Sequence, residues 1–188
     1  MSKKFIDDQI FDKIAISQLD PGDYENCKFI NSDLSNCDLS YRNFSQCEFI
    51  DCNLSLVKLS NTSFREVHFK KCKLLGCHFE NCNEFLFTVT YEDCILNLSS
   101  FYKHKLKNIS IKNCSLHEVD FTNVDLTGAI FENCDFSGAI FENSILEKAD
   151  FRSSIHYSIN PEINRIKKAK FSISGIIGLL GKYEIEID

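Results

Sequence analysis

The sequence FTNVDLTGAIFENCDFSGAIFENSILEKADFRSS, residues 121–154, has a large apolar residue at every fifth position. We call these residues the centres of the repeat, and in this stretch they are Phe121, Leu126, Phe131, Phe136, Phe141, Leu146 and Phe151. A period of five matches neither the 3.6-residue period of an α-helix nor the two-residue alternation of a strand. The pattern therefore predicts a repeat architecture.

The same period extends over most of the chain and is interrupted once. Centres recur from Phe29 to Phe79 and again from Leu96 to Phe151, but Phe79 and Leu96 lie two residues too far apart for whole repeats. We expect an irregularity within residues 82–91, where Leu86 and Tyr91 resume the centres and Glu84 and Phe85 form a bulge or small loop. Such a bulge is either a tolerated irregularity or a projecting contact site, and the pattern favours neither.

All ten cysteines occupy one step of the repeat, two residues before a centre, or before Glu84 where a centre is missing. They are Cys27, Cys37, Cys47, Cys52, Cys72, Cys77, Cys82, Cys94, Cys114 and Cys134. If stacked repeats lie ~4.8 Å apart, a column of these thiols is too widely spaced for a tetrahedral zinc site or for disulfides. We therefore predict free thiols that serve as small buried side chains, with no metal.

Asparagine recurs two residues after the centre, at Asn31, Asn36, Asn61, Asn81, Asn108, Asn113, Asn123, Asn133 and Asn143, and Gly128 and Gly138 share this step. Both residue types suit a turn, so we expect a corner at this position.

Composition narrows the class of protein. A chain of 188 residues with 44% hydrophobic content can form one domain with a real core. No apolar run is long enough to span a membrane, and residues 1–13 do not resemble a secretory signal. Without such a signal, ten cysteines indicate free thiols in a reducing compartment, and we expect the protein in the cytoplasm. The five histidines form no catalytic motif, and we find no phosphate loop or nucleophile elbow, so we expect neither an enzyme nor a cofactor.

Charge is segregated along the chain, whose net charge is −6. Residues 118–150 have a net charge of −7, residues 61–82 of +2 and residues 100–117 of +4. The acids of the first segment, which we call the acidic band, are Glu118, Asp120, Asp125, Glu132, Asp135, Glu142, Glu147 and Asp150. They are either a solvated polar surface or a partner-binding surface that imitates the phosphates of DNA. We predict a protein partner and no direct contact with nucleic acid.

The end of the chain, residues 159–188, departs from the repeat at Pro161. We expect a short helix from Ser174 to Leu180 and a short strand over 183–187. Its apolar residues exceed what is needed to cap a solenoid, so we predict a two-fold homodimer interface, with a purely intramolecular cap as the alternative. The predicted interface residues are Phe171, Ile173, Ile176, Ile177, Leu179, Leu180, Tyr183, Ile185 and Ile187.

The repeats SDLSN (32–36), CDLSY (37–41), VDLTG (124–128) and CDFSG (134–138) resemble the pentapeptide-repeat family. That resemblance implies an all-β fold, a right-handed quadrilateral β-helix with four repeats per coil and the centres pointing inward. We assign it to residues 27–158, preceded by an N-terminal cap (1–26) and followed by a C-terminal module (159–188).

The sequence of the C-terminal module resembles one branch of this family in particular. INPEINRIKKAKF (159–171), followed by GLLGKYEIEI (178–187), is similar to the C-terminal module of the Qnr and microcin-immunity branch. This similarity implies a homodimer formed through the tail and an acidic rod that binds DNA gyrase or topoisomerase IV in place of DNA. It also implies protection from quinolones or gyrase-directed toxins. The alternative is a scaffold with an unrelated protein partner.

Overall fold

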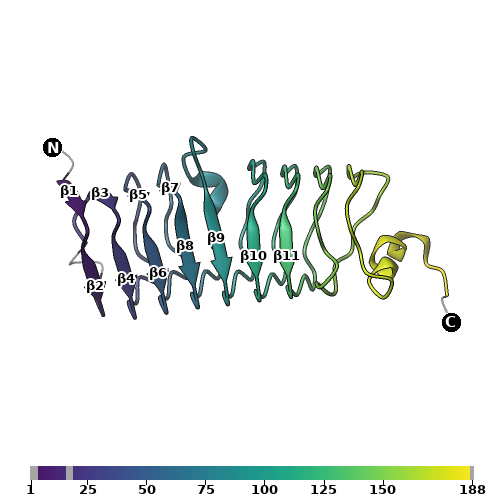
Figure 1. Cartoon of the computed structure of the whole chain (residues 1–188), viewed down its shortest axis with the longest axis horizontal. Coiled ribbons are helices and arrows are strands. Elements are labelled where there is room, and N and C mark those ends of the chain that lie inside the picture. The colour runs from purple at the N-terminus through teal and green to yellow at the C-terminus, as the bar shows by residue number, and fades with distance from the viewer. Residues whose placement is uncertain (1–3, 16–18, 187–188) are drawn as a thin grey trace.

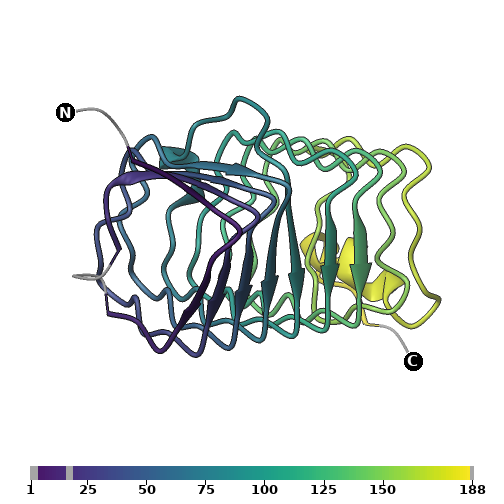
Figure 2. The same cartoon turned by 60° about the vertical axis from the view of Figure 1, so that its left-hand side comes forward.

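The computed structural model describes residues 4–15 and 19–186 of the chain. The chain winds coil upon coil into a rod, with the two termini at opposite ends (Figure 1). Viewed obliquely, the coils are four-sided and stack in register (Figure 2). The predicted all-β solenoid is therefore confirmed.

Two faces of the rod carry parallel sheets. Face A is formed by β1 (Lys4–Asp7), β3 (Gly22–Glu25), β5 (Asn43–Ser45) and β7 (Ser63–Arg65). Face B is formed by β2 (Ile10–Asp12), β4 (Lys28–Ile30), β6 (Glu48–Ile50), β8 (Val67–Lys70), β9 (Val89–Glu92), β10 (Ser110–Lys112) and β11 (Ile130–Glu132). Neighbouring strands in each sheet are successive coils, so a residue stacks on the residue 20 positions later wherever the repeat is regular, as Phe29 does on Phe49.

The other two faces are held by single parallel bridges. Face C contains the series Asp33, Asn53, Lys73, and face D the series Ser100, Asp120, Ile140. Together the faces place four repeats in each coil, in the chain order A, B, C, D. The backbone groups of each coil thereby bond to the coils on either side of it.

The centres fill the axis of the rod. On face B the rings of Phe29, Phe49 and Phe69 stack with centroids 4.6 and 5.1 Å apart. Phe44 of face A meets Phe49 edge-on at 5.4 Å. Aromatic pairs in these geometries contribute about 0.5–1.5 kcal/mol each beyond the burial of their area. Because one side chain fills the axis at each position, like residues stack on like, as in Leu34 on Leu54.

The predicted corners are confirmed for eight of the nine asparagines. Their φ angles lie between 51° and 60°, the left-handed region that Asn tolerates better than most residues. At six of these corners the backbone N–H donates to a carbonyl of the next coil, as from Asn36 to Ser55 at 2.8 Å. Asn81 is the exception, because it belongs to the 3₁₀ turn η2 (Phe79–Asn81), where the chain leaves its regular path.

The irregular segment between η2 and β9 projects from the rod as a loop (Figure 1). Tyr91 is buried as predicted, but the prediction for Leu86 is wrong, since its side chain is 51% exposed. Phe87 turns inward instead, with its ring 4.4 Å from that of His104. The two additional residues let the backbone swing outward before it returns to the axis one position later than expected.

His104 fills the space beneath this loop. Its ring is buried, and Nε2 donates a hydrogen bond to the carbonyl of Phe79 at 2.9 Å. Burial lowers the pKa of His104, so the ring is held neutral. A bulky side chain replaces the usual small one here, and it packs against the inward ring of Phe87.

At the N-terminal end, the segment predicted as a cap continues the solenoid over its described residues. β1 pairs in parallel with β3, and β2 pairs with β4. The aromatic ring of Phe11 stacks on that of Phe29 at 5.0 Å, which extends the axis by one more layer.

At the C-terminal end, the winding continues beyond the predicted module boundary at 159, since Arg165 and Lys170 bridge to Ile145 and Asp150 of the preceding coil. Two 3₁₀ turns follow, η3 (Ile176–Leu179) and η4 (Gly181–Tyr183). The expected helix over 174–180 is thus a single 3₁₀ turn, and the expected strand is absent from residues 183–186. Gly178 explains the tight path, because a Cβ there would lie 2.1 Å from the carbonyl oxygen of Tyr157. Phe171 stacks on Phe151 at 5.5 Å, so the module covers the last coil.

Candidate partner-binding surface

The acidic band does not form a single surface, because the structure distributes its residues around the rod. The register places Asp125 and Glu147 on face A, Glu132 and Asp150 on face B, Asp135 on face C, Asp120 and Glu142 on face D, and Glu118 at the corner that leads into face D.

Five of these eight carboxylates have partners on the protein itself. Asp125 pairs with Lys107 at 3.3 Å, Glu132 with Lys112 at 3.3 Å, and Glu147 with Arg165 at 2.7 Å. Asp150 lies 2.8 Å from Arg152 and 3.5 Å from Lys170, and Asp135 contacts His117 and His156 at 3.1 and 2.9 Å. These carboxylates are therefore partly neutralised.

The pKa shifts of two of these groups agree with the contacts. Hydrogen bonds from Arg152 lower the pKa of Asp150 to about 2. Partial burial acts to raise the pKa of Asp135, but hydrogen bonds from His156, Ser137 and His117 outweigh it and keep this pKa well below its usual value. Both carboxylates are thus held in the charged form by neighbours that any partner would have to displace.

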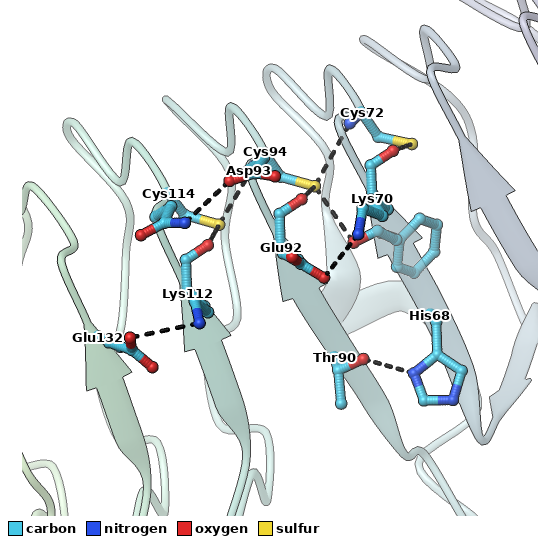
Figure 3. A network of polar contacts seen from close by, with 12 residues as sticks. His68, Lys70, Cys72, Thr90, Glu92, Asp93, Cys94, Lys112, Cys114 and Glu132 are labelled. Atoms are coloured by element: carbon cyan, nitrogen blue, oxygen red, sulfur yellow. Dashed lines mark hydrogen bonds and ion pairs between the residues drawn. The ribbon is translucent and has the colours of Figure 1, made fainter.

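Most of these pairs join neighbouring coils, as do Lys70 with Glu92 and Lys112 with Glu132 in Figure 3. The four coils between residues 52 and 133 alternate in net charge to match. Residues 52–71 have a net charge of +3, residues 72–93 of −3, residues 94–113 of +4 and residues 114–133 of −4. Like charges directly opposite each other on adjacent strands repel. The alternation of basic and acidic segments in the sequence therefore has a structural role in stacking the coils.

Three carboxylates remain outside this pattern. Among the described residues, Glu118, Asp120 and Glu142 form no ion pair, and all three lie on face D or at its leading corner. Exposed apolar side chains accompany them on this part of the rod. We call the group the face-D patch, and it consists of Leu98, Tyr102, Glu118, Asp120, Ile140 and Glu142.

The sequence alone did not single out this patch, and Leu98 and Tyr102 were missed. A signal existed, because Ser100, Asp120 and Ile140 are twenty residues apart and bridge one another in the structure. One cation lies beside these side chains, since the ammonium of Lys103 is over the ring of Tyr102 at 4.8 Å. The patch thus combines apolar side chains with carboxylates that form no ion pair among the described residues.

The cysteines are placed as predicted. Cys52, Cys72, Cys94, Cys114 and Cys134 follow one side of the rod, and all ten thiols are free. Cys72 donates to a carbonyl of the preceding coil at 3.3 Å. Cys94 does the same at 3.4 Å (Figure 3). Burial raises the pKa of Cys47 and of Cys77 to about 12. Within residues 4–15 and 19–186, no group of His, Cys, Asp and Glu has a geometry suited to a metal ion.

Comparison with known proteins agrees with this architecture. The family described as pentapeptide repeat region matches residues 23–84 and 73–151. The chain belongs to the pentapeptide repeat family. No curated protein matches its sequence significantly.

Two solved pentapeptide-repeat structures illustrate the likeness. HetL, involved in heterocyst differentiation regulation in the cyanobacterium Nostoc sp. strain PCC 7120, is 17% identical and superimposes with a TM-score of 0.59 over 91% of this chain and 85% of its own. A trypsin-treated variant of QnrB1, a plasmid-mediated fluoroquinolone resistance protein, is 19% identical with a TM-score of 0.49 over 99% and 98% of the two chains. At these identities the likeness to HetL shows the shared fold alone.

The C-terminal module of this pentapeptide-repeat protein presents an apolar end surface. Ile173 is 94% exposed, and Ile176, Ile177, Tyr183 and Ile185 are also exposed. Three other predicted interface residues serve the module itself, since Phe171, Leu179 and Leu180 are half-buried. Ile187 lies outside the described residues. The surface is therefore open in the single chain.

In the part of the chain that the structure describes, no helix has the length and apolar character needed to cross a bilayer.

Proposed function

We propose that this pentapeptide-repeat protein is a non-enzymatic binder of a type II topoisomerase, DNA gyrase or topoisomerase IV, and occupies the site of DNA. Its role would be to protect the enzyme from quinolones or gyrase-directed toxins. The observation that carries the proposal is the face-D patch, where the only carboxylates of the acidic band that are unpaired among the described residues lie together.

Unpaired carboxylates are the ones that a basic surface can bind without first breaking an ion pair. Asp120 and Glu142 lie on adjacent coils of face D, so their spacing along the rod is ~5 Å. An enzyme surface that binds DNA presents Lys and Arg to closely spaced phosphates. Carboxylates fixed on a rigid rod suit the same cations, and the exposed Ile140 and Tyr102 add apolar contact area.

The C-terminal module supports the proposal through dimerisation. Its exposed apolar side chains, led by Ile173, are the residues expected in a two-fold interface. The face-D patch occupies the C-terminal half of the rod, so joining two rods at these ends would place two patches on one longer particle. The cytoplasm suits both the proposed target and a protein with ten free thiols.

A gyrase supercoiling and cleavage assay, with and without a quinolone, tests the proposal. We expect wild-type protein to change supercoiling or drug-induced cleavage and the triple variant E118Q/D120N/E142Q to bind gyrase about tenfold more weakly or worse. Each exposed charge contact contributes on the order of 0.5–1 kcal/mol, and three are removed.

The matched control is D125N/E132Q/E147Q, which removes the same charge from carboxylates that are already paired. We expect it to bind nearly as well as wild type once thermal melting shows that it folds. Equal loss in both triples would refute the role of the face-D patch. Absence of any wild-type effect on gyrase would refute the topoisomerase proposal and leave the scaffold with an unrelated partner.

A further inference from the structure

Face A carries an open hollow of about 340 Å³ in the N-terminal half of the rod. Phe5 of β1 lies at one end, and Phe85 and Leu86 of the projecting loop lie at the other. In Figure 1 the loop rises at the same edge of the rod as the labels of β1, β3, β5 and β7. The hollow therefore crosses the four strands of face A along the rod axis.

The shape of the hollow follows from the size of the outward side chains. Asn43 and Ser45 of β5 and Ser63 of β7 are short and form its floor. The side chains at the two ends are large, so the floor lies between raised apolar walls. The floor is polar, and part of its hydrogen-bonding capacity is used within the protein, since Asn43 donates to Asp23 at 2.6 Å. The walls offer apolar surface.

The apolar walls have no role in the core. Phe85 is 76% exposed and Phe5 is 64% exposed, while Phe87 fills the axis beneath the loop. Two adjacent large apolar side chains in the loop, both facing solvent, are an unfavourable arrangement unless a partner covers them. The insertion that creates the loop is the main departure from regular winding between Phe29 and Phe151, and it creates this wall.

Arg65 gives the hollow a chemical preference. Its guanidinium bonds to the hydroxyl of Ser45 at 2.8 and 3.1 Å and forms no ion pair among the described residues. By contrast, Lys70 on the same coil forms an ion pair with Glu92 on the next coil, at 3.2 Å. On face A the loop displaces the next coil, so Arg65 is left without a carboxylate. At the far end, near Phe5, Asp23 and Glu25 disfavour a second acid.

We infer that the hollow binds an extended segment of a protein partner, with apolar side chains at its two ends and a carboxylate next to the one held by Phe85 and Leu86. Four strand spacings of ~4.8 Å correspond to about six residues of extended chain. The carboxylate pairs with Arg65, and the backbone of the segment bonds to the short polar side chains of the floor. This surface is separate from the face-D patch and does not depend on the topoisomerase proposal.

Two blocked hexapeptide probes test the inference with the ¹⁵N-labelled full chain by NMR titration. The first is Phe-Ser-Gly-Ser-Leu-Glu, and the second has Gln in place of Glu. We expect saturable shifts at the amides of Asn43, Ser45 and Ser63, with the Glu probe about three- to fivefold tighter, as an exposed ion pair allows. The variant R65Q should bind both probes equally.

The variant F85S/L86S should weaken both probes about tenfold or more, because it removes one apolar wall. Its matched control is L56S/I130S, since Leu56 has the same kind of exposed corner position as Leu86, with φ of 57° against 58°. The control should bind as wild type does. No saturable shift on the floor with either probe would overturn the inference, as would equal weakening by the control. Neither outcome bears on the gyrase assay.

Discussion

The position two residues before each centre selects side chains by size and by hydrogen bonding together. Cys72 donates to the carbonyl of Phe49 across the coil boundary, and Ser144 makes the equivalent bond to Phe121 at 2.7 Å. Thr62 does the same toward Leu39 at 2.9 Å. A small side chain with one weak or moderate donor fits the wall of the rod. The cysteines are therefore exchangeable with Ser and Thr in principle, which explains their number without any metal or redox chemistry.

Thiol reactivity is the test at this scale. In native protein at pH 7.5 we expect a disulfide reagent such as DTNB to modify Cys37 first, because it is the only cysteine that is not fully buried. The others should react very slowly because their sulfur atoms are buried and out of reach of the reagent. At Cys134 burial also raises the pKa to about 11, so little thiolate forms there.

Under denaturing conditions all ten thiols should react, and C37S should remove the fast native phase. Rapid native modification of the column from Cys52 to Cys134 would contradict the structural role assigned to these thiols.

Single residues also mark the limit of prediction from sequence. The corner role of Asn followed from its chemistry, because left-handed φ is accessible to it. The choice of Phe87 over Leu86 as the inward residue did not follow, since both are apolar and an insertion of two residues can be accommodated on either side of them. Phe87 is the inward residue because its ring packs against that of His104, and this contact joins segments from different coils.

At the scale of the coil, electrostatics supports the register that the centres define. Between residues 52 and 133 neighbouring coils carry opposite net charge. Ion pairs also connect coils elsewhere in the rod, as Lys28 does with Glu48 at 2.9 Å. A slipped coil would bring like charges together as well as misplacing its centres.

A double-mutant cycle on Lys28 and Glu48 measures this contribution. These two residues are opposite each other on β4 and β6, and the next residue in the row is His68. We expect K28E and E48K each to lower the free energy of unfolding by about 0.5–1 kcal/mol in urea denaturation.

The swapped double variant K28E/E48K should recover most of that loss, and high salt should reduce all three effects. Strict additivity of the two single variants would show that this ion pair between coils does not stabilise the stack.

Elements with a strong period were predictable, and those set by close approach were not. The twenty-residue recurrence of Leu34, Leu54 and Leu74 is by itself enough to indicate a four-sided coil. The tail instead follows the contact of Gly178 with Tyr157, which a pattern of apolar and acidic residues does not encode. The acidic band was likewise visible as a run in sequence, but only the folded register separates its paired carboxylates from Glu118, Asp120 and Glu142.

For the whole molecule, the C-terminal end of the rod determines the predicted association state. The C-terminal end is apolar, and we expect the variant I173E/I177E to convert a dimer into a monomer in sedimentation velocity experiments. Both side chains are exposed in the single chain, so the fold should persist. Burying two charges in a two-fold interface is strongly unfavourable.

The control is I130E, an exposed isoleucine on face B away from that end. It should leave the association state unchanged. A wild-type chain that sediments as a monomer at micromolar concentration would refute the dimer and favour an intramolecular cap.

Because each coil bonds only to its two neighbours, the rod also acts as a ruler. Adding or removing one regular coil between the projecting loop and the C-terminal module would shift one relative to the other by ~4.8 Å and rotate it only slightly. The distance between two binding surfaces on this molecule is thus adjustable in discrete steps, without redesign of either surface. A partner that contacts both surfaces would bind only when the distance between them matches its own. The affinity of that partner for a chain lengthened by one coil would test this dependence.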